Sequence, residues 1–121
     1  MTDTYFFTSI VIDTLSGHHL AIGELRRASR PWISRITWLE IMASAPAGAR
    51  EETETFLGNF AIREITPEIA RRAANMRSDR PDLSLPAALI FASAQDQGAI
   101  LVTRNIKDFP ANIPGIRVPY T

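Results

Sequence analysis

Apolar residues in this chain fall into short dense runs that predict strands. Residues 5–12, YFFTSIVI, form an aromatic and β-branched run with little polar alternation, which is typical of a strand covered on both faces. Shorter apolar runs at residues 32–34, 60–65 and 99–103 predict three further strands. We interpret the first run as a central strand of a parallel sheet.

Between these runs, apolar residues recur at the three- and four-residue spacing of helices. Ser34 is a candidate helix N-cap, as is Thr66, which Pro67 and Glu68 follow, and Gly98 is placed as a helix stop. The predicted helices span residues 20–29, a segment that begins after Ser34, and residues 50–59, 66–77 and 84–97. Strands that alternate with helices indicate an α/β domain with a mostly parallel central sheet.

The composition is that of one ordinary soluble domain. The chain has 121 residues, of which 45% are apolar and 21% charged, and no linker or repeat interrupts residues 1–121. Thirteen basic and thirteen acidic residues give zero net charge, which argues against binding nucleic acid mainly through counterion release. No apolar run approaches the roughly 18 to 20 residues that cross a bilayer, and the N-terminus lacks the basic start of a signal peptide. We therefore expect a cytoplasmic protein with no membrane partner.

The residue types present exclude several kinds of catalytic site. The chain has no cysteine, which excludes thiol nucleophiles and cysteine-based zinc sites. Its two histidines, His18 and His19, are adjacent in a predicted loop and give little support for histidine acid–base catalysis. A glycine-rich phosphate loop and a G-x-S-x-G motif are also missing. Carboxylate chemistry remains, because Asp and Glu side chains can bind Mg²⁺ and activate water for attack on a phosphodiester.

The ends of the predicted strands indicate where such a site would lie. In open α/β sheets, binding sites lie at the carboxyl ends of the strands. The predicted strands bring Asp13, Ser34 and residues 103–108 to this edge.

Three segments of the chain are similar to the sequence blocks of a known family. They are, in chain order, FFTSIVIDTLSG, WISRITWLEIM and LSLPAALIFASAQDQGAILVTRNIKDFP, and they resemble PIN-domain ribonucleases of the VapC toxin type. The resemblance covers nearly the whole chain, and the block around LVTRNIKDF is highly specific. It implies a single PIN-like three-layer α/β/α domain over residues 1–121. It also implies a homodimeric, Mg²⁺-dependent endoribonuclease that a VapB-type antitoxin neutralises.

Two positions where this family has acidic metal ligands are not acidic here. The first block normally has Asp directly before Thr-Ser, but Phe7 precedes Thr8 and Ser9 in this chain. The third acid normally follows Leu-Pro, and Ala87 takes its place. A single-residue deletion explains the first difference as well as a substitution does, because Tyr-Phe-Phe followed by Asp-Thr-Ser is a natural form of the block.

The other acidic positions of the family have counterparts. Glu40 matches the second acid, Asn105 takes a position that is Asp in some members, and Asp108 follows it. The resemblance therefore implies Glu40 and Asp108 as metal ligands and Asn105 as a further candidate catalytic residue. The supporting polar residues are Thr8, Ser9 and Thr103.

Asp13 is a second candidate for the first acid. It ends an apolar run and is followed by Thr14, so it has the same Asp-Thr form. The family's spacing between its first two acids favours Phe7 over Asp13 for that position, and the segment VID is itself part of the block.

A site with fewer carboxylates binds Mg²⁺ less well, because this ion gives up its water reluctantly. We expect weak or absent Mg²⁺ binding, with Mn²⁺ as an alternative metal, and a VapC-like ribonuclease toxin that is impaired or inactive toward RNA. The alternative function is a non-catalytic regulatory module that keeps the antitoxin-binding and dimer surfaces. Apolar residues around Trp38, Leu39 and Phe56 exceed what one small core covers, which supports the homodimer.

Overall fold

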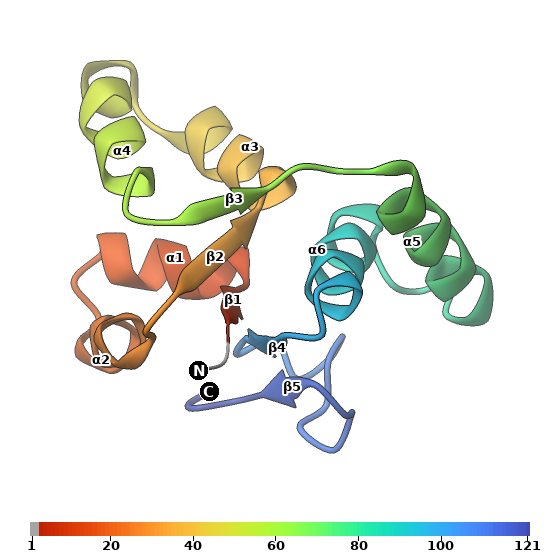
Figure 1. Cartoon of the computed structure of the whole chain (residues 1–121). Helices are drawn as coiled ribbons and strands as arrows, with labels where there is room; N and C mark the ends of the chain where they lie inside the picture. Colours follow the sequence, from red (N-terminus) through yellow and green to blue (C-terminus); the bar gives the residue numbers. More distant parts are fainter. Residues whose placement is uncertain (1–2) are drawn as a thin grey trace.

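The computed structural model describes residues 3–121, which fold around one five-stranded sheet (Figure 1). Its strands follow the order β3-β2-β1-β4-β5, and every neighbouring pair is parallel. The strands are β1 Thr4–Phe6, β2 Pro31–Ser34, β3 Ala61–Arg63, β4 Ile100–Val102 and β5 Ile116–Arg117. Parallel neighbours need crossover connections, and helices supply most of them.

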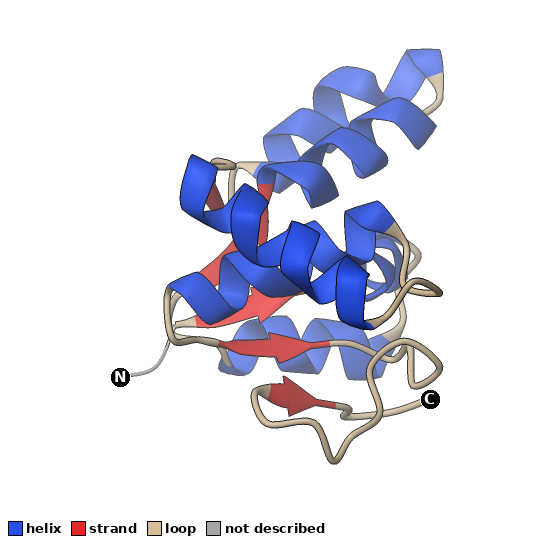
Figure 2. Ribbon diagram, turned by 90° about the vertical axis from the view of Figure 1, so that its right-hand side faces the viewer, coloured by secondary structure: helices blue, strands red, loops and turns tan. Residues whose placement is uncertain are grey.

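Helices cover both faces of this sheet, as Figures 1 and 2 show. In Figure 1, α1, α2 and α4 lie on one side of the strands, and α5 and α6 lie on the other. The helices are α1 Thr8–Leu15, α2 His19–Arg27, α3 Arg35–Ser44, α4 Arg50–Leu57, α5 Pro67–Asp79 and α6 Leu85–Asp96, with a short 3₁₀ helix at Ala47–Ala49. Within residues 3–121, no helix has the length and apolar character needed to cross a membrane. The predicted three-layer α/β/α class is confirmed.

Two apolar clusters, one on each face, hold the three layers together. Phe6, Ile33 and Val102 are buried with residues of α1 to α4, whereas Tyr5 and Leu101 are buried with α5 and α6. Successive side chains of a strand point to opposite faces, so neighbouring residues of β1 and of β4 belong to different clusters. The strands are therefore covered on both faces, as their apolar composition predicts.

The predicted helix starts are confirmed by their capping hydrogen bonds. The hydroxyl groups of Ser34, Thr66 and Ser84 accept hydrogen bonds from backbone N–H groups in the first turns of α3, α5 and α6. Gly98 follows the end of α6 with a φ of 67°, a left-handed conformation that glycine adopts without strain. The two histidines do not both lie in a loop, because His19 is the first residue of α2.

The strand predicted at residues 5–12 is wrong in its extent. β1 ends at Phe6, and residues 8–15 form α1 instead. Ile10 and Val11 are buried against the cluster that contains Phe6 and Ile33, so their burial on a helix face outweighs the β preference of a β-branched run. As a consequence, Asp13 lies in α1 and not at the end of a strand.

The edge strand β5 was not predicted. It contains only Ile116 and Arg117, which pair with Leu101 and Val102 of β4. Two residues are too few for a periodic pattern, so only the sheet itself reveals the strand.

Candidate functional site

The carboxyl ends of β1, β2 and β4 lie next to one another because these strands are adjacent and parallel. Phe7 directly follows β1, α3 directly follows β2, and Thr103 directly follows β4. The resemblance places the candidate residues on these connections and at the start of α6. The structure thus brings the segments that bear them to one edge of the sheet.

An aromatic side chain occupies the position directly after β1. Phe7 donates its backbone N–H to the Val102 carbonyl oxygen at 2.9 Å, which fixes it beside the end of β4. Its ring meets that of Phe109 edge-on with 5.6 Å between centroids, and Phe109 meets Phe91 in the same way at 5.2 Å. Phe109 is fully buried. Phe7 therefore belongs to an aromatic cluster of Phe7, Phe91 and Phe109.

Glu40 lies close to this junction. The Thr8 hydroxyl group is 2.6 Å from Oε1 of Glu40, to which it donates, and 3.1 Å from the Thr37 hydroxyl oxygen. Thr8 begins α1 immediately after Phe7, so the hydrogen bond ties Glu40 on α3 to the end of β1. Glu40, which the resemblance matches to the second acid of the family, therefore lies near the end of β1.

The segment after β4 forms a compact turn around Asn105 and Asp108. The Thr103 hydroxyl oxygen accepts the Asn105 backbone N–H at 3.1 Å, and the Asn105 amide donates to Oδ2 of Asp108 at 2.8 Å. Arg80 donates to the backbone carbonyl oxygen of Asp108 at 2.6 Å. Both candidate side chains of this turn therefore face each other, and Phe109 follows them into the core.

Ala87 and Ser9 complete the set of residues that the sequence indicated. Ala87 is 2% exposed and belongs to the apolar cluster on which Phe7 packs. Its backbone N–H donates to the Ser84 hydroxyl oxygen at 3.2 Å in the first turn of α6. The buried hydroxyl oxygen of Ser9 has no hydrogen-bond partner among residues 3–121.

A sequence model of the PIN domain matches residues 1–111. The chain belongs to the PIN domain family. A solved structure described as a toxin–antitoxin complex from Klebsiella pneumoniae contains a similar chain, with 39% identity, a TM-score of 0.86, and coverage of 97% of this chain and 98% of that one. No curated protein sequence matches.

Two further solved structures have the same fold at lower identity. The DNA-bound VapBC structure from Salmonella typhimurium is 22% identical with a TM-score of 0.78, covering 97% of this chain and 96% of the other. The FitAcB structure from Neisseria gonorrhoeae is 18% identical with a TM-score of 0.76, covering 96% and 97%. These two structures share the fold of this chain, and the resemblance to PIN domains of toxin–antitoxin systems is confirmed by the family model together with the 39% identical chain.

The donor atoms present in this PIN domain do not fit a metal centre of carboxylates. Among residues 3–121 there is no group of three or more His, Cys, Asp or Glu side chains able to hold a metal ion. Glu40 accepts from Thr8, Asp108 accepts from Asn105, and the resemblance puts Phe7 and Ala87 at the other two acid positions. Mg²⁺ requires oxygen ligands in near-octahedral geometry, so in a site with two carboxylates most of these ligands would have to be water. The assignment of Glu40 and Asp108 as ligands stays a prediction.

Asp13 makes a separate set of contacts in the PIN domain. It accepts from Nε and Nη2 of Arg104, at 2.6 and 3.1 Å, and from the Tyr120 hydroxyl group at 2.8 Å. The Tyr120 ring stacks on His18 with 4.6 Å between centroids. These contacts tie α1 to the segment after β4 and to the C-terminal residues. No local sequence pattern indicates Tyr120, because its partner Asp13 is more than a hundred residues away.

The ion pair between Asp13 and Arg104 makes stability depend on pH. The hydrogen bonds from Arg104, which outweigh partial burial, hold the pKa of Asp13 below its ordinary value. The contribution of this ion pair to the free energy of unfolding is complete above about pH 4, the pKa of Asp in the unfolded chain. It is lost as the pH falls through the lowered pKa that Asp13 has in the folded state. We expect Asp13→Asn to reduce the free energy of unfolding at neutral pH by about 1 kcal/mol. Urea titrations should show that this difference disappears in acid.

The exposed carboxyl Asp82 provides the control for this measurement. Its nearest cation, Arg80, lies at 4.0 Å, and its side chain is 73% exposed. Asp82→Asn should change stability little at either pH. An Asp13→Asn variant as stable as the parent at neutral pH would contradict the prediction.

Proposed function

We propose that this chain is a VapC-like toxin of a type II toxin–antitoxin pair whose Mg²⁺-dependent endoribonuclease activity is impaired or absent. The observation that supports the loss is the aromatic contact of Phe7 with Phe109, because it fills with apolar carbon the position that the resemblance assigns to the family's first acid. Ala87, buried beside the same cluster, supports the loss of a second acid. Cytoplasmic location, RNA as the substrate of any residual activity, and Mg²⁺ or Mn²⁺ as its metal are parts of the same proposal.

A non-catalytic regulatory module is the second candidate function. It is favoured by the small number of retained carboxylates, Glu40 and Asp108, each of which accepts a hydrogen bond from a neighbouring side chain, Thr8 and Asn105 respectively. A protein of this kind would keep its partner surfaces and bind an antitoxin without cleaving RNA.

An RNA cleavage assay tests whether any ribonuclease activity remains, which the first function allows and the second does not. We expect purified protein to degrade RNA little above background in Mg²⁺ or Mn²⁺, and any residual cleavage to stop on addition of EDTA. Glu40→Gln should remove a residual activity that uses the candidate site and should leave a contaminating nuclease unchanged. Rapid, EDTA-sensitive cleavage that Glu40→Gln abolishes would contradict the proposed impairment.

An apolar groove is the surface best suited to the antitoxin. It has a volume of about 550 Å³ and lies between α1 and the region from α3 to α4, with Ile12, Leu15, Ile41 and Pro46 in its lining. Ile12 and Leu15 are 43% and 45% exposed, although both are large and apolar. Exposed apolar patches of this kind favour binding of an apolar segment of a partner.

With two acids absent, we expect the affinity of the antitoxin complex to depend less on salt concentration than that of an intact relative.

A charge placed in the groove tests this surface. We expect Leu15→Glu to weaken binding of a co-expressed VapB-type antitoxin by about tenfold or more, because complex formation would bury an unpaired carboxylate. Affinity measured by calorimetry or by pull-down titration checks this. Leu20→Glu is the matched control, since Leu20 on α2 is 47% exposed but does not line the groove. Equal losses in both variants would place the antitoxin elsewhere.

The homodimer also belongs to this proposal. Leu39 is 51% exposed on α3, and its neighbour Trp38 and Phe56 on α4 are only half-buried. A second copy of the chain would cover apolar area that the monomer leaves in water.

A further inference from the structure

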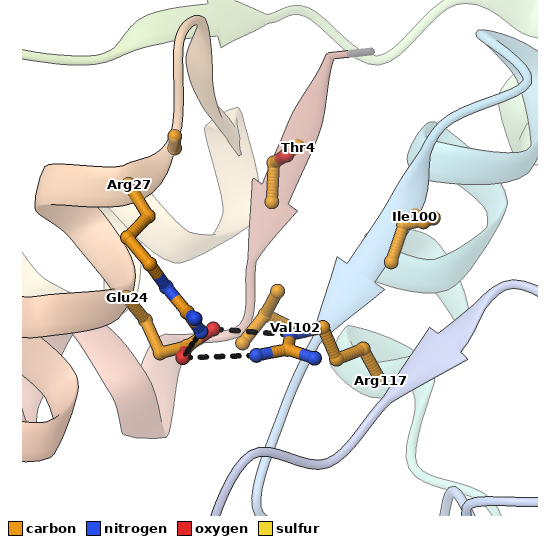
Figure 3. A pocket seen from close by; sticks show the side chains of 7 residues that line it. Thr4, Glu24, Arg27, Ile100, Val102 and Arg117 are labelled. Carbon is orange, nitrogen blue, oxygen red and sulfur yellow. Dashed lines mark hydrogen bonds and ion pairs between the residues drawn. The ribbon is translucent and has the colours of Figure 1, made fainter.

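A second concave site lies over the edge of the sheet between α2 and the strands β4 and β5 (Figure 3). Thr4, Ile100 and Val102 line it from the strands, and Arg27 and Arg117 line it from α2 and β5. Its volume is about 240 Å³. None of its lining residues is among the candidate residues at the carboxyl edge, so the PIN-family site does not explain it.

Two guanidinium groups converge on one carboxylate in this pocket, as the dashed lines of Figure 3 show. Arg117 donates to Glu24 through Nε at 3.1 Å and Nη2 at 3.0 Å, and Arg27 also forms an ion pair with Glu24. Burial alone would raise the pKa of Glu24, but the hydrogen bonds and charges of the two arginines hold it below its ordinary value. Two cations against one ionised anion leave a net charge of about +1.

The excess positive charge is accessible to a ligand. The side chains of Arg27 and Arg117 are 65% and 48% exposed, whereas that of Glu24 is 11% exposed. Within residues 3–121, Nε and Nη1 of Arg27 and Nη1 of Arg117 donate no hydrogen bond. The pocket thus combines a largely covered carboxylate with unused guanidinium donors at its rim.

From this geometry we propose that the pocket binds a phosphate group, either as the free ion or at the end of a nucleotide. Guanidinium forks match the oxygens of phosphate, and a phosphate with close to two negative charges competes with the Glu24 carboxylate better than a single carboxylate does. The volume lies below the roughly 300 Å³ at which sites for whole drug-sized ligands begin, so it suits one small anionic group. Ile100, which is 39% exposed, provides apolar surface in the lining of the pocket.

Calorimetric titration of the full chain tests the site with three probes, namely inorganic phosphate, adenosine 5′-monophosphate and adenosine. We expect both phosphates to bind and adenosine not to bind. Tighter binding of the nucleotide than of inorganic phosphate would identify a nucleotide as the source of the phosphate, and equal binding would identify the free ion. Binding of adenosine as tight as that of its monophosphate, or no binding of either phosphate, would overturn the proposal.

Substitutions locate the binding in the pocket. Arg117→Gln and Arg27→Gln should each weaken phosphate binding by about tenfold, because each removes charged hydrogen bonds. Arg26→Gln is the matched control, since Arg26 is exposed on the same helix and does not line the pocket. Equal affinity in all three variants would overturn the proposal.

Glu24→Gln gives a result that a merely structural ion pair would not produce. Removing the internal anion frees both guanidinium groups, so this variant should bind phosphate more tightly than the parent. Circular dichroism shows whether the Glu24→Gln variant is folded. If that variant is unfolded, Arg27→Gln, at a mostly exposed position, still tests the site. Weaker phosphate binding by a folded Glu24→Gln protein would count against the site.

Discussion

Phe7→Asp combined with Ala87→Asp is expected to confer Mg²⁺-dependent RNA cleavage and toxicity on expression. Ala87 belongs to the apolar cluster against which Phe7 packs, and the hydrogen bond of Glu40 with Thr8 holds Glu40 next to the residue that follows Phe7. Two new carboxylates together with Glu40 and Asp108 would provide the convergent oxygen ligands that Mg²⁺ requires. Neither single substitution should suffice, because a lone added carboxylate mainly adds repulsion.

The fold contains features that favour both new carboxylates. Phe7 has the extended backbone of a helix N-cap but provides no side-chain acceptor to α1, and an Asp there would accept an N–H of the first turn. Ala87 is the third residue of α6, where the positive end of the helix dipole favours a negative charge. These gains offset part of the cost of losing the contact between Phe7 and Phe109.

The repaired double variant is compared with the parent and with each single variant in an RNA cleavage assay with and without EDTA. Adding Glu40→Gln to the double variant should abolish cleavage and toxicity together. A folded double variant that cleaves no RNA would contradict the substitution hypothesis, and the deletion hypothesis is then tested by its own repair.

Insertion of Asp between Phe7 and Thr8 is that repair. With this insertion, the strand would move by one residue and place Phe7 where Phe6 now lies. The hydrogen bond from the Tyr5 hydroxyl group to Gln97, at 2.5 Å, would be lost in this shift. If neither repair produces cleavage in protein that circular dichroism shows to be folded, the proposed position of the site is wrong.

Features of the fold that depend on neighbouring residues could be predicted from the sequence. The N-caps at Ser34, Thr66 and Ser84 were predictable because a cap involves a hydroxyl group and an N–H two or three residues away. The limits of the strand at residues 5–12 could not be predicted in this way. A short β-branched run is compatible with both helix and strand, and tertiary packing decides between them. In this chain, the buried side chains of Ile10 and Val11 decide for the helix.

The chemistry of the site could be predicted only in part. The sequence blocks that resemble the family predict Glu40 as a site residue and Phe7 and Ala87 as positions without an acid, and the structure brings the segments that bear them together at one edge of the sheet. What fills the position after β1 depends on Phe109, which is 102 residues further along the chain, and no local pattern predicts that contact. The same holds for the contact of Asp13 with Arg104 and Tyr120.

Phe109→Ala is expected to cost about 3–5 kcal/mol of unfolding free energy, the usual range for removing a fully buried phenylalanine. Its ring is completely buried between Phe7 and Phe91, so the substitution leaves a cavity at the edge where the candidate site lies. Ile106→Ala in the same segment is the control, because Ile106 is 52% exposed, and its change should stay within about 0.5 kcal/mol. Urea unfolding followed by circular dichroism measures both. A loss below about 1 kcal/mol for Phe109→Ala would mean that the aromatic cluster contributes little to packing. Replacing Phe7 with an acidic residue would then cost little unfolding free energy.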